Sequence, residues 1–144
     1  MQVNNIIKLN NMKEDFNKEY VMCNINMISL LTANEFVVFN EIIYLCNNNR
    51  NCLSLKCLES QLKMSINTIR KAINQLVILK LISKHQDYNV GCCCYNLNLD
   101  VIADVYKKLK SFNSIEERQL YCEQYVESCI NKANAISQQL TNND

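Results

Sequence analysis

The chain has 144 residues, of which 49% are hydrophobic and 20% are charged, and its formal net charge is +1. This length and composition predict one globular domain with room for a helical arm, and exclude a need for a metal or disulfide to stabilise the fold. Because Pro is absent and Gly91 is the only glycine, few residues break helices and a helix-rich fold is expected.

Residues 1–28 are predicted to form an N-terminal arm. Residues 1–18 are polar and rich in Asn, which predicts a frayed start. From Tyr20 to Ile28 the pattern alternates, as is typical of a half-buried strand or of an extended segment that leads into the domain. The residues on its apolar face are Val21, Cys23, Ile25 and Met27.

The first helix is predicted to begin after Thr32. Thr32 and Glu35 form a T-x-x-E capping box, in which each side chain accepts a hydrogen bond from the backbone N–H of the other residue. The polar run 47–51 ends the helix as a loop. The buried stripe is predicted to contain Phe36, Phe39, Ile43 and Cys46, with Val37 and Leu45 at its flanks.

Two short helices separated by a tight turn follow. Ser54 is placed as the N-cap of the first and Ser65 as the N-cap of the second, with Met64 in the turn. The first helix has Leu55, Leu58 and Leu62 as its apolar positions. The second has a buried side made of Ile66, Ile69, Ala72, Ile73 and Leu76. Its opposite side carries Asn67, Lys71, Asn74, Gln75 and Ile78, with Thr68 and Arg70 at the margins.

Two strands are predicted next, at 81–84 and 93–98, joined by residues 85–91 as a loop long enough to project. Asn98 or Asp100 can begin another helix. That helix has Ile102, Val105, Leu109 and Phe112 as predicted buried residues, and Lys107, Lys108 and Lys110 in its last turns.

A last helix is predicted from a second capping box, Ser114 with Glu117, to about Leu140. Its apolar residues recur at alternating spacings of four and three, as in a coiled coil. One heptad position holds Ile115, Cys122, Cys129 and Ile136, and the other holds Val126, Ala133 and Leu140. Two hypotheses follow: the helix pairs two copies as a parallel homodimer, or it folds back onto its own domain.

The stretch from Thr32 to Asn98, about half of the chain, resembles the winged helix-turn-helix domain, particularly the version at the N-termini of phage and plasmid replication initiators and replisome organisers. The matching residues include Leu58, Leu62, Met64, Ser65, Thr68–Ile73, Leu76 and Leu81–Ile82. The resemblance implies an α+β, mostly helical fold, with a winged helix-turn-helix at 29–98 and a C-terminal helical extension at 99–144. Lys63 and Lys80 stand where this family often has Gly, so a positive φ at Lys63 would carry a conformational cost.

Positive charge is concentrated in the helix-turn-helix. Between Arg50 and Lys84 there are seven basic residues and one acidic residue, a net charge of +6, whereas the rest of the chain carries −5. Such a local excess is what binding of phosphates requires. Together with the resemblance, it predicts duplex DNA as the partner.

In this interpretation the helix after Ser65 enters the major groove, where Asn67, Lys71 and Asn74 are best placed to contact base edges. The N-terminus of the preceding helix favours a phosphate. The predicted loop would reach the backbone or the minor groove, with Gln86 and Asn89 beside its main contacts. The candidate DNA-binding residues are Ser54, Lys56, Ser65, Asn67, Thr68, Arg70, Lys71, Asn74, Gln75, Lys84, His85 and Tyr88.

The predicted function is non-catalytic binding of duplex DNA, as a transcriptional regulator or an origin-binding accessory for replication or transfer of a phage or plasmid. The alternative is a winged-helix protein–protein interaction module that does not bind DNA. An enzyme is not expected, because His85 is the only histidine and neither a Gly-rich loop nor an H-E-x-x-H motif is present. We expect no cofactor and no small-molecule substrate.

The first residues lack the apolar core of a signal peptide, and no segment is long enough to span a bilayer, so a cytoplasmic protein outside the membrane is expected. In that reducing compartment the nine cysteines are predicted to be free thiols buried as small hydrophobic groups. A less favoured alternative is a zinc site made from Cys52, Cys57, His85 and the run 92–94, which no C-x-x-C pair supports.

Overall fold

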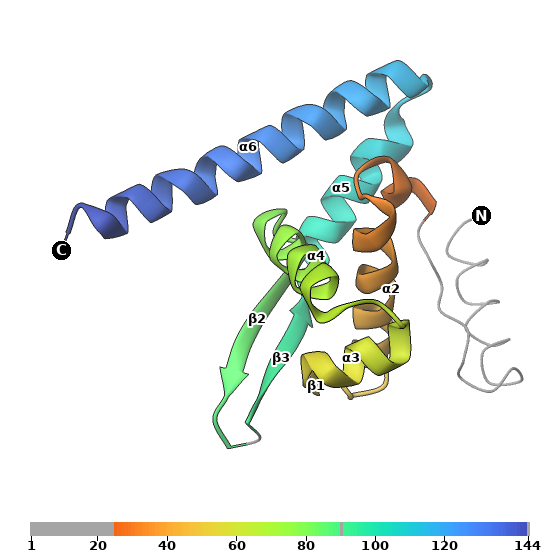
Figure 1. The fold of residues 1–144 in the computed structure, drawn as a ribbon. Coiled ribbons are helices and arrows are strands. Elements are labelled where there is room, and N and C mark those ends of the chain that lie inside the picture. The colour runs from red at the N-terminus through yellow and green to blue at the C-terminus, as the bar shows by residue number, and fades with distance from the viewer. Residues whose placement is uncertain (1–24, 90, 144) are drawn as a thin grey trace, which may run out of the picture.

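The computed structural model describes residues 25–89 and 91–143. Over these residues the fold is α+β and mostly helical, with a small antiparallel sheet whose strand order is β1-β3-β2 (Figure 1). In chain order the elements are η1 (Ile25–Ser29), α2 (Ala33–Asn47), β1 (Cys52–Leu53), α3 (Leu55–Leu62), α4 (Ile66–Ile78), β2 (Ile82–Asp87), β3 (Cys92–Leu97), α5 (Leu99–Ser111) and α6 (Ile115–Thr141).

The N-terminal arm differs from its prediction where the structure describes it. Residues 25–29 form the short 3₁₀ helix η1 instead of the end of a strand. Met27 is buried in the core, whereas its neighbour Ile28 is exposed. The rest of the predicted strand, residues 20–24, lies outside the described residues, as does the predicted frayed start at 1–18.

Helix α2 begins as its capping box predicts. The backbone N–H of Glu35 donates to Thr32 Oγ1 (3.3 Å), and the N–H of Thr32 donates to Glu35 Oε2 (3.0 Å). The predicted buried stripe was only partly correct, because Val37 is 45% exposed. The helix is rotated so that the residues buried against α4 and the rest of the core are Val38, Phe39, Ile42 and Leu45.

Helices α3 and α4 form the predicted pair. Ser54 accepts a hydrogen bond from the N–H of Cys57, and Ser65 accepts one from the N–H of Thr68, each at 3.2 Å. The turn between the helices uses Lys63 in the left-handed conformation, with φ 53°. The side chains that anchor this pair in the core are Leu58, Ile69, Ala72, Ile73 and Leu76. Ile66 is half-buried.

The hairpin is longer and its connection shorter than predicted. Strand β2 continues through His85 to Asp87, and the antiparallel register runs from Ile82 opposite Leu97 to Asp87 opposite Cys92. The predicted projecting loop at 85–91 is therefore wrong. The turn is closed by Asp87, whose carbonyl accepts from the N–H of Gly91 at 2.8 Å, and Gly91 has φ 73°. The hairpin extends away from α4 in Figure 1.

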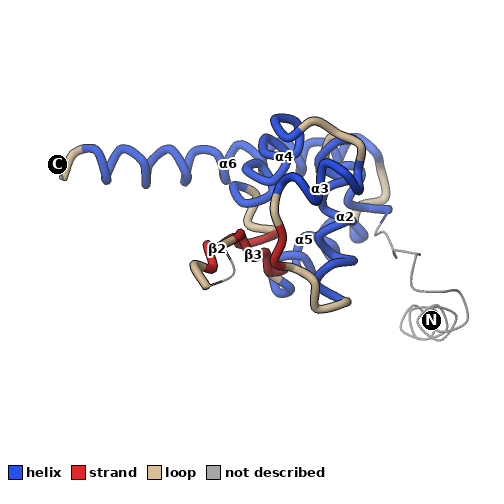
Figure 2. The backbone as a smooth tube through the Cα atoms, turned by 60° about the horizontal axis from the view of Figure 1, so that its bottom comes forward, coloured by secondary structure: helices blue, strands red, loops and turns tan. Residues whose placement is uncertain are grey.

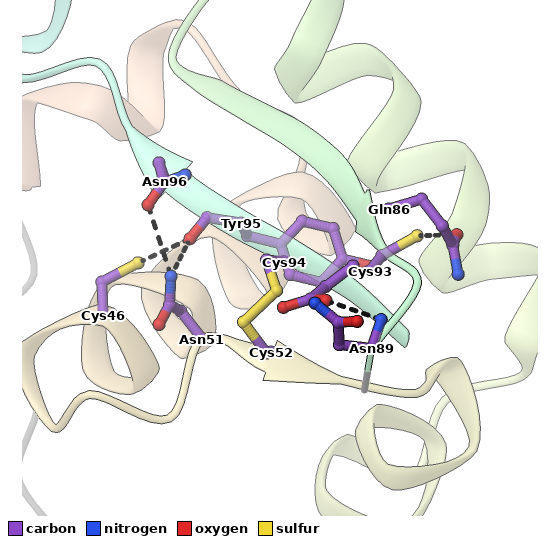
Figure 3. Close-up of a disulfide and its surroundings, with 10 residues drawn as sticks. Cys46, Asn51, Cys52, Gln86, Asn89, Cys93, Cys94, Tyr95 and Asn96 are labelled. Atoms are coloured by element: carbon purple, nitrogen blue, oxygen red, sulfur yellow. Dashed lines mark hydrogen bonds between the residues drawn. A yellow bond between two sulfur atoms is a disulfide. The ribbon is translucent and has the colours of Figure 1, made fainter. Parts of the chain in front are cut away.

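The prediction of free cysteines was wrong for one pair. Strand β1 lies beside β3 with Cys52 opposite Cys94, and the two form a disulfide across a sequence separation of 42 residues (Figure 3). Neighbouring positions on two paired strands bring side chains within bonding distance, and sequence spacing alone did not reveal this. Cys122 and Cys129 are buried thiols, as predicted, whereas the Cys57 thiol is exposed.

Helices α5 and α6 complete the described fold. In α5, Val105 and Leu109 are buried as predicted, whereas Ile102 and Phe112 are only half-buried. Asn98 is the N-cap residue of α5, but its side chain donates to the Lys80 carbonyl (2.7 Å) instead of capping the helix.

The first half of α6 folds back onto its own domain. Cys122 and Cys129 are buried there, so this part of the predicted heptad seam is covered and is not free to pair with a second copy. The second half runs past the other elements (Figure 2). Ile136 and Leu140 continue the same heptad positions but are 56% and 66% exposed. Ile115, at the start of the helix, is also exposed.

Candidate nucleic-acid interface

Helix α4 presents a polar face on the side opposite its buried stripe. Asn67, Arg70, Lys71 and Asn74 are exposed on this face. The apolar residues of α4 are held in the core, so the orientation of the polar face is fixed by packing. Ile78, at the end of the helix, is half-buried and packs against the core, which places it outside the polar face.

Two hydrogen bonds order the side chains of this face. Arg70 Nη1 donates to Asn67 Oδ1 at 3.2 Å, one turn earlier on the same helix. Lys84 Nζ, from strand β2, donates to Asn74 Oδ1 at 3.1 Å. The second bond ties the hairpin to α4. Because the oxygen of Asn74 accepts from Lys84, its Nδ2 group is left as a donor.

A groove of about 390 Å³ lies between the start of α3, the polar face of α4 and the hairpin. The predicted residues that it brings together are Ser54, Arg70, Asn74 and Lys84, with Gln86 beside them. No residue that lines the groove is acidic. The two cationic side chains therefore face it without a neutralising carboxylate in its walls, which favours an anionic ligand.

Strand alternation decides which hairpin residues face the groove. Lys84 and Gln86 are two apart on β2 and lie opposite Tyr95 and Cys93 on β3, and all four line the groove. His85 falls between them and lies on the other face of the hairpin. Cys93 and Tyr95 were not among the predicted DNA-binding residues. Strand alternation places both residues on the side of the groove, but it can be applied only when the register of the two strands is known.

The remaining predicted residues do not line the groove. Lys71 is exposed on the α4 face beside it, and Gln75 is half-buried on the same helix. Ser65 and Thr68 are occupied by a local contact, because their hydroxyls lie 2.8 Å apart at the start of α4. Lys56 is exposed in the first turn of α3, and Tyr88 is 90% exposed in the hairpin turn.

Tyr95 of β3 lines the groove and is buried, and hydrogen bonds hold its backbone in place (Figure 3). Tyr95 donates its backbone N–H to the Asn51 carbonyl at 2.9 Å. Its own carbonyl accepts from Asn51 Nδ2 at 2.6 Å and from Cys46 Sγ at 3.4 Å. Burial, with smaller effects of the Cys93 and Cys92 thiols, raises the pKa of the Tyr95 phenol to about 12. The phenol is therefore neutral at physiological pH.

The disulfide connects the two walls of this site. Cys52 directly precedes Leu53 and Ser54, and Cys94 lies between Cys93 and Tyr95; all four of these neighbours line the groove. The alternative zinc site loses two of its proposed ligands in this form, since Cys52 and Cys94 are bonded to each other. Within residues 25–89 and 91–143, no group of three or more His, Cys, Asp or Glu side chains is arranged to hold a metal.

No helix in the described part of the chain is both long enough and apolar enough to cross a bilayer. Compared with protein-family models, curated proteins and solved structures, the chain has no match in any of the three.

Proposed function

We propose that the chain binds duplex DNA through a winged helix-turn-helix in which α3 and α4 are the helix pair and β2–β3 is the wing. The observation that carries the proposal is the continuous polar surface formed by the α4 face and Lys84. This surface is exposed and includes Asn67, Lys71 and Asn74. Neither α5 nor α6 covers these three side chains.

The chemistry of this surface divides into two kinds of contact. Asn67, Lys71 and Asn74 carry the amide and ammonium groups that read purine edges in a major groove. Arg70 and Lys84 line the adjoining groove and are suited to backbone phosphates. The N-terminus of α3, where Ser54 is the N-cap, adds backbone N–H groups that attract a phosphate.

The proposed role is control of a phage or plasmid, as a transcriptional regulator or an origin-binding accessory for its replication or transfer. The resemblance of residues 32–98 to replication initiators supports this role. The binding surface is proposed to act without catalysis, because it combines amide and cationic groups but no candidate nucleophile with an adjacent general base.

The test is binding to duplex DNA over a range of salt concentrations, measured by fluorescence anisotropy. Each phosphate neutralised contributes about −0.9 to the slope of log K against log salt. We expect Lys71→Ala to weaken binding, with a lower salt slope if Lys71 contacts a phosphate. Lys107→Ala, which removes the same charge from an exposed position on α5, should leave binding unchanged.

Sequence reading is tested with a site selected from random DNA. Asn74→Ala is expected to weaken binding to that site by about 1–3 kcal/mol and binding to random DNA much less. Equal losses on both DNAs would show that Asn74 does not read bases. Binding that barely responds to salt would instead favour a protein–protein interaction module.

A further inference from the structure

A second pocket, of about 460 Å³, lies between the end of α4, helix α5 and helix α6. It shares no lining residue with the groove beside α4. The polar residues that line it include Lys80, Asp104, Lys108 and Lys132, which come from three separate segments of the chain. We refer to it as the α5–α6 pocket.

The charge of the α5–α6 pocket is strongly positive for its size. Three lysines and one aspartate line it, which gives a local net charge of +2. These lysines are far apart in the sequence and are brought together by the tertiary fold. They therefore differ from charges that lie close in sequence on one solvent-exposed face of a helix. A concave surface lined by one sign of charge focuses the field and attracts an ion of the opposite sign.

Three aromatic rings pack in a row, and two of them line the pocket. The ring centroids of Phe112 and Tyr121 are 5.6 Å apart, and those of Tyr121 and Tyr125 are 6.1 Å apart. The ammonium of Lys108 lies 5.6 Å from the centroid of Phe112, at one end of the row. Tyr121 and Tyr125 line the pocket itself. Planar ligands stack on such rings, while phosphate groups pair with nearby ammonium groups.

Both pocket tyrosines are neutral at physiological pH, and a hydrogen bond holds Tyr125 in place. The hydroxyl of Tyr125 donates to the carbonyl of Leu79 at 2.7 Å, which anchors the ring against the end of α4. Burial raises the pKa of both Tyr121 and Tyr125. Neither phenol therefore adds negative charge to the pocket at physiological pH.

We propose that the α5–α6 pocket binds a free nucleoside phosphate. Its phosphates pair with Lys80, Lys108 and Lys132, and its base packs against the tyrosine rings. Asp104 is the one acceptor with a negative charge and suits a ribose hydroxyl. The inference is independent of the proposed DNA binding, because the two surfaces have no residue in common.

The experiment uses isothermal titration of the full chain with three probes. ATP carries both charge and base, inorganic phosphate only charge, and adenosine only the base. We expect ATP to bind more tightly than adenosine by at least about tenfold, since adenosine cannot pair with the lysines. ATP should bind more tightly than phosphate by at least about fivefold, because ATP adds both a base that stacks and two further phosphates.

A matched pair of variants locates the site. Lys132→Ala removes an exposed pocket lysine and is expected to weaken ATP binding about fivefold. Lys107→Ala removes an exposed lysine outside the pocket and should leave the affinity for ATP unchanged. Equal affinities for ATP in the two variants would overturn the proposal. So would loss of ATP binding in Arg70→Ala but not in Lys132→Ala, because ATP would then occupy the groove beside α4. Absence of ATP binding at about 1 mM would also overturn it.

Discussion

Reduction of the Cys52–Cys94 disulfide is expected to lower the free energy of unfolding substantially. The bond closes a loop with a sequence separation of 42 residues. In the chain-entropy account, opening a loop of this length restores about 13 cal/mol/K to the unfolded chain, or about 4 kcal/mol at 25 °C. Measured disulfides commonly contribute about 2–4 kcal/mol, so about 4 kcal/mol is the upper end of the expectation.

Urea unfolding followed by circular dichroism measures this difference, with and without a dithiol. Cys52 is exposed, so a dithiol can reach the bond. In Cys52→Ser the bond cannot form, and the stabilities measured with and without dithiol should be equal. In Cys57→Ser an exposed free thiol is lost, and the effect of the dithiol should remain as large as in the unaltered chain.

Two results would refute this reasoning. One is equal stability of the unaltered chain with and without dithiol. The other is a count of thiols under denaturing conditions that does not rise by two after reduction. Equal stability would mean that the bond does not contribute to the free energy of unfolding. An unchanged thiol count would mean that Cys52 and Cys94 are not bonded, and the original expectation of free thiols at these positions would stand.

Three further predictions concern backbone strain, pH and the end of α6. Lys63→Gly should raise the free energy of unfolding, measured in urea, by about 0.5–1 kcal/mol. The reason is that Gly relieves the left-handed strain at φ 53° by more than it adds conformational entropy to the unfolded chain. Lys63→Ala should give no such gain. Tyr95 keeps its proton in the folded state up to about pH 12 but loses it near pH 10 when unfolded, so the free energy of unfolding should fall as the pH rises between these values. Tyr95→Phe should reduce that fall when unfolding is measured as a function of pH. Tyr88→Phe, at an exposed tyrosine, should not. Removal of residues 134–144, exposed wherever described, should change stability by no more than about 0.5 kcal/mol. Sedimentation gives the number of chains per particle in both forms, and an unchanged number would contradict pairing of two copies through this segment.

Local signals were the part of this fold that the sequence predicted well. Thr32, Ser54 and Ser65 each cap a helix through a bond to a residue three positions later, and their residue type together with the apolar pattern that follows identifies them. The outward face of α4 was correct at Asn67, Lys71 and Asn74, because a helix repeats every 3.6 residues, but not at Ile78, which packs half-buried against the core. These two features define most of the candidate interface.

Local sequence patterns could not predict the pairing of strands that lie far apart in the sequence. The disulfide depends on Cys52 lying opposite Cys94 across two strands that are far apart in the sequence. The length of the hairpin depends on pairing that continues to Asp87, although the residues 85–87 are polar and read as a loop. The groove and the α5–α6 pocket follow from these tertiary arrangements, so only individual residues of each could be anticipated.

Lys80 is the position where conformational strain and the proposed ligand site coincide. It has φ 59°, a conformation that suits Gly better than Lys, yet its side chain lines the α5–α6 pocket. Lys80→Gly should therefore raise the free energy of unfolding by about 0.5–1 kcal/mol and weaken ATP binding about fivefold. Lys80→Ala should weaken ATP binding equally without the gain in stability. If Lys80→Gly gains stability and keeps full affinity for ATP, the lysine is not retained for this pocket, and the strain at Lys80 needs another explanation.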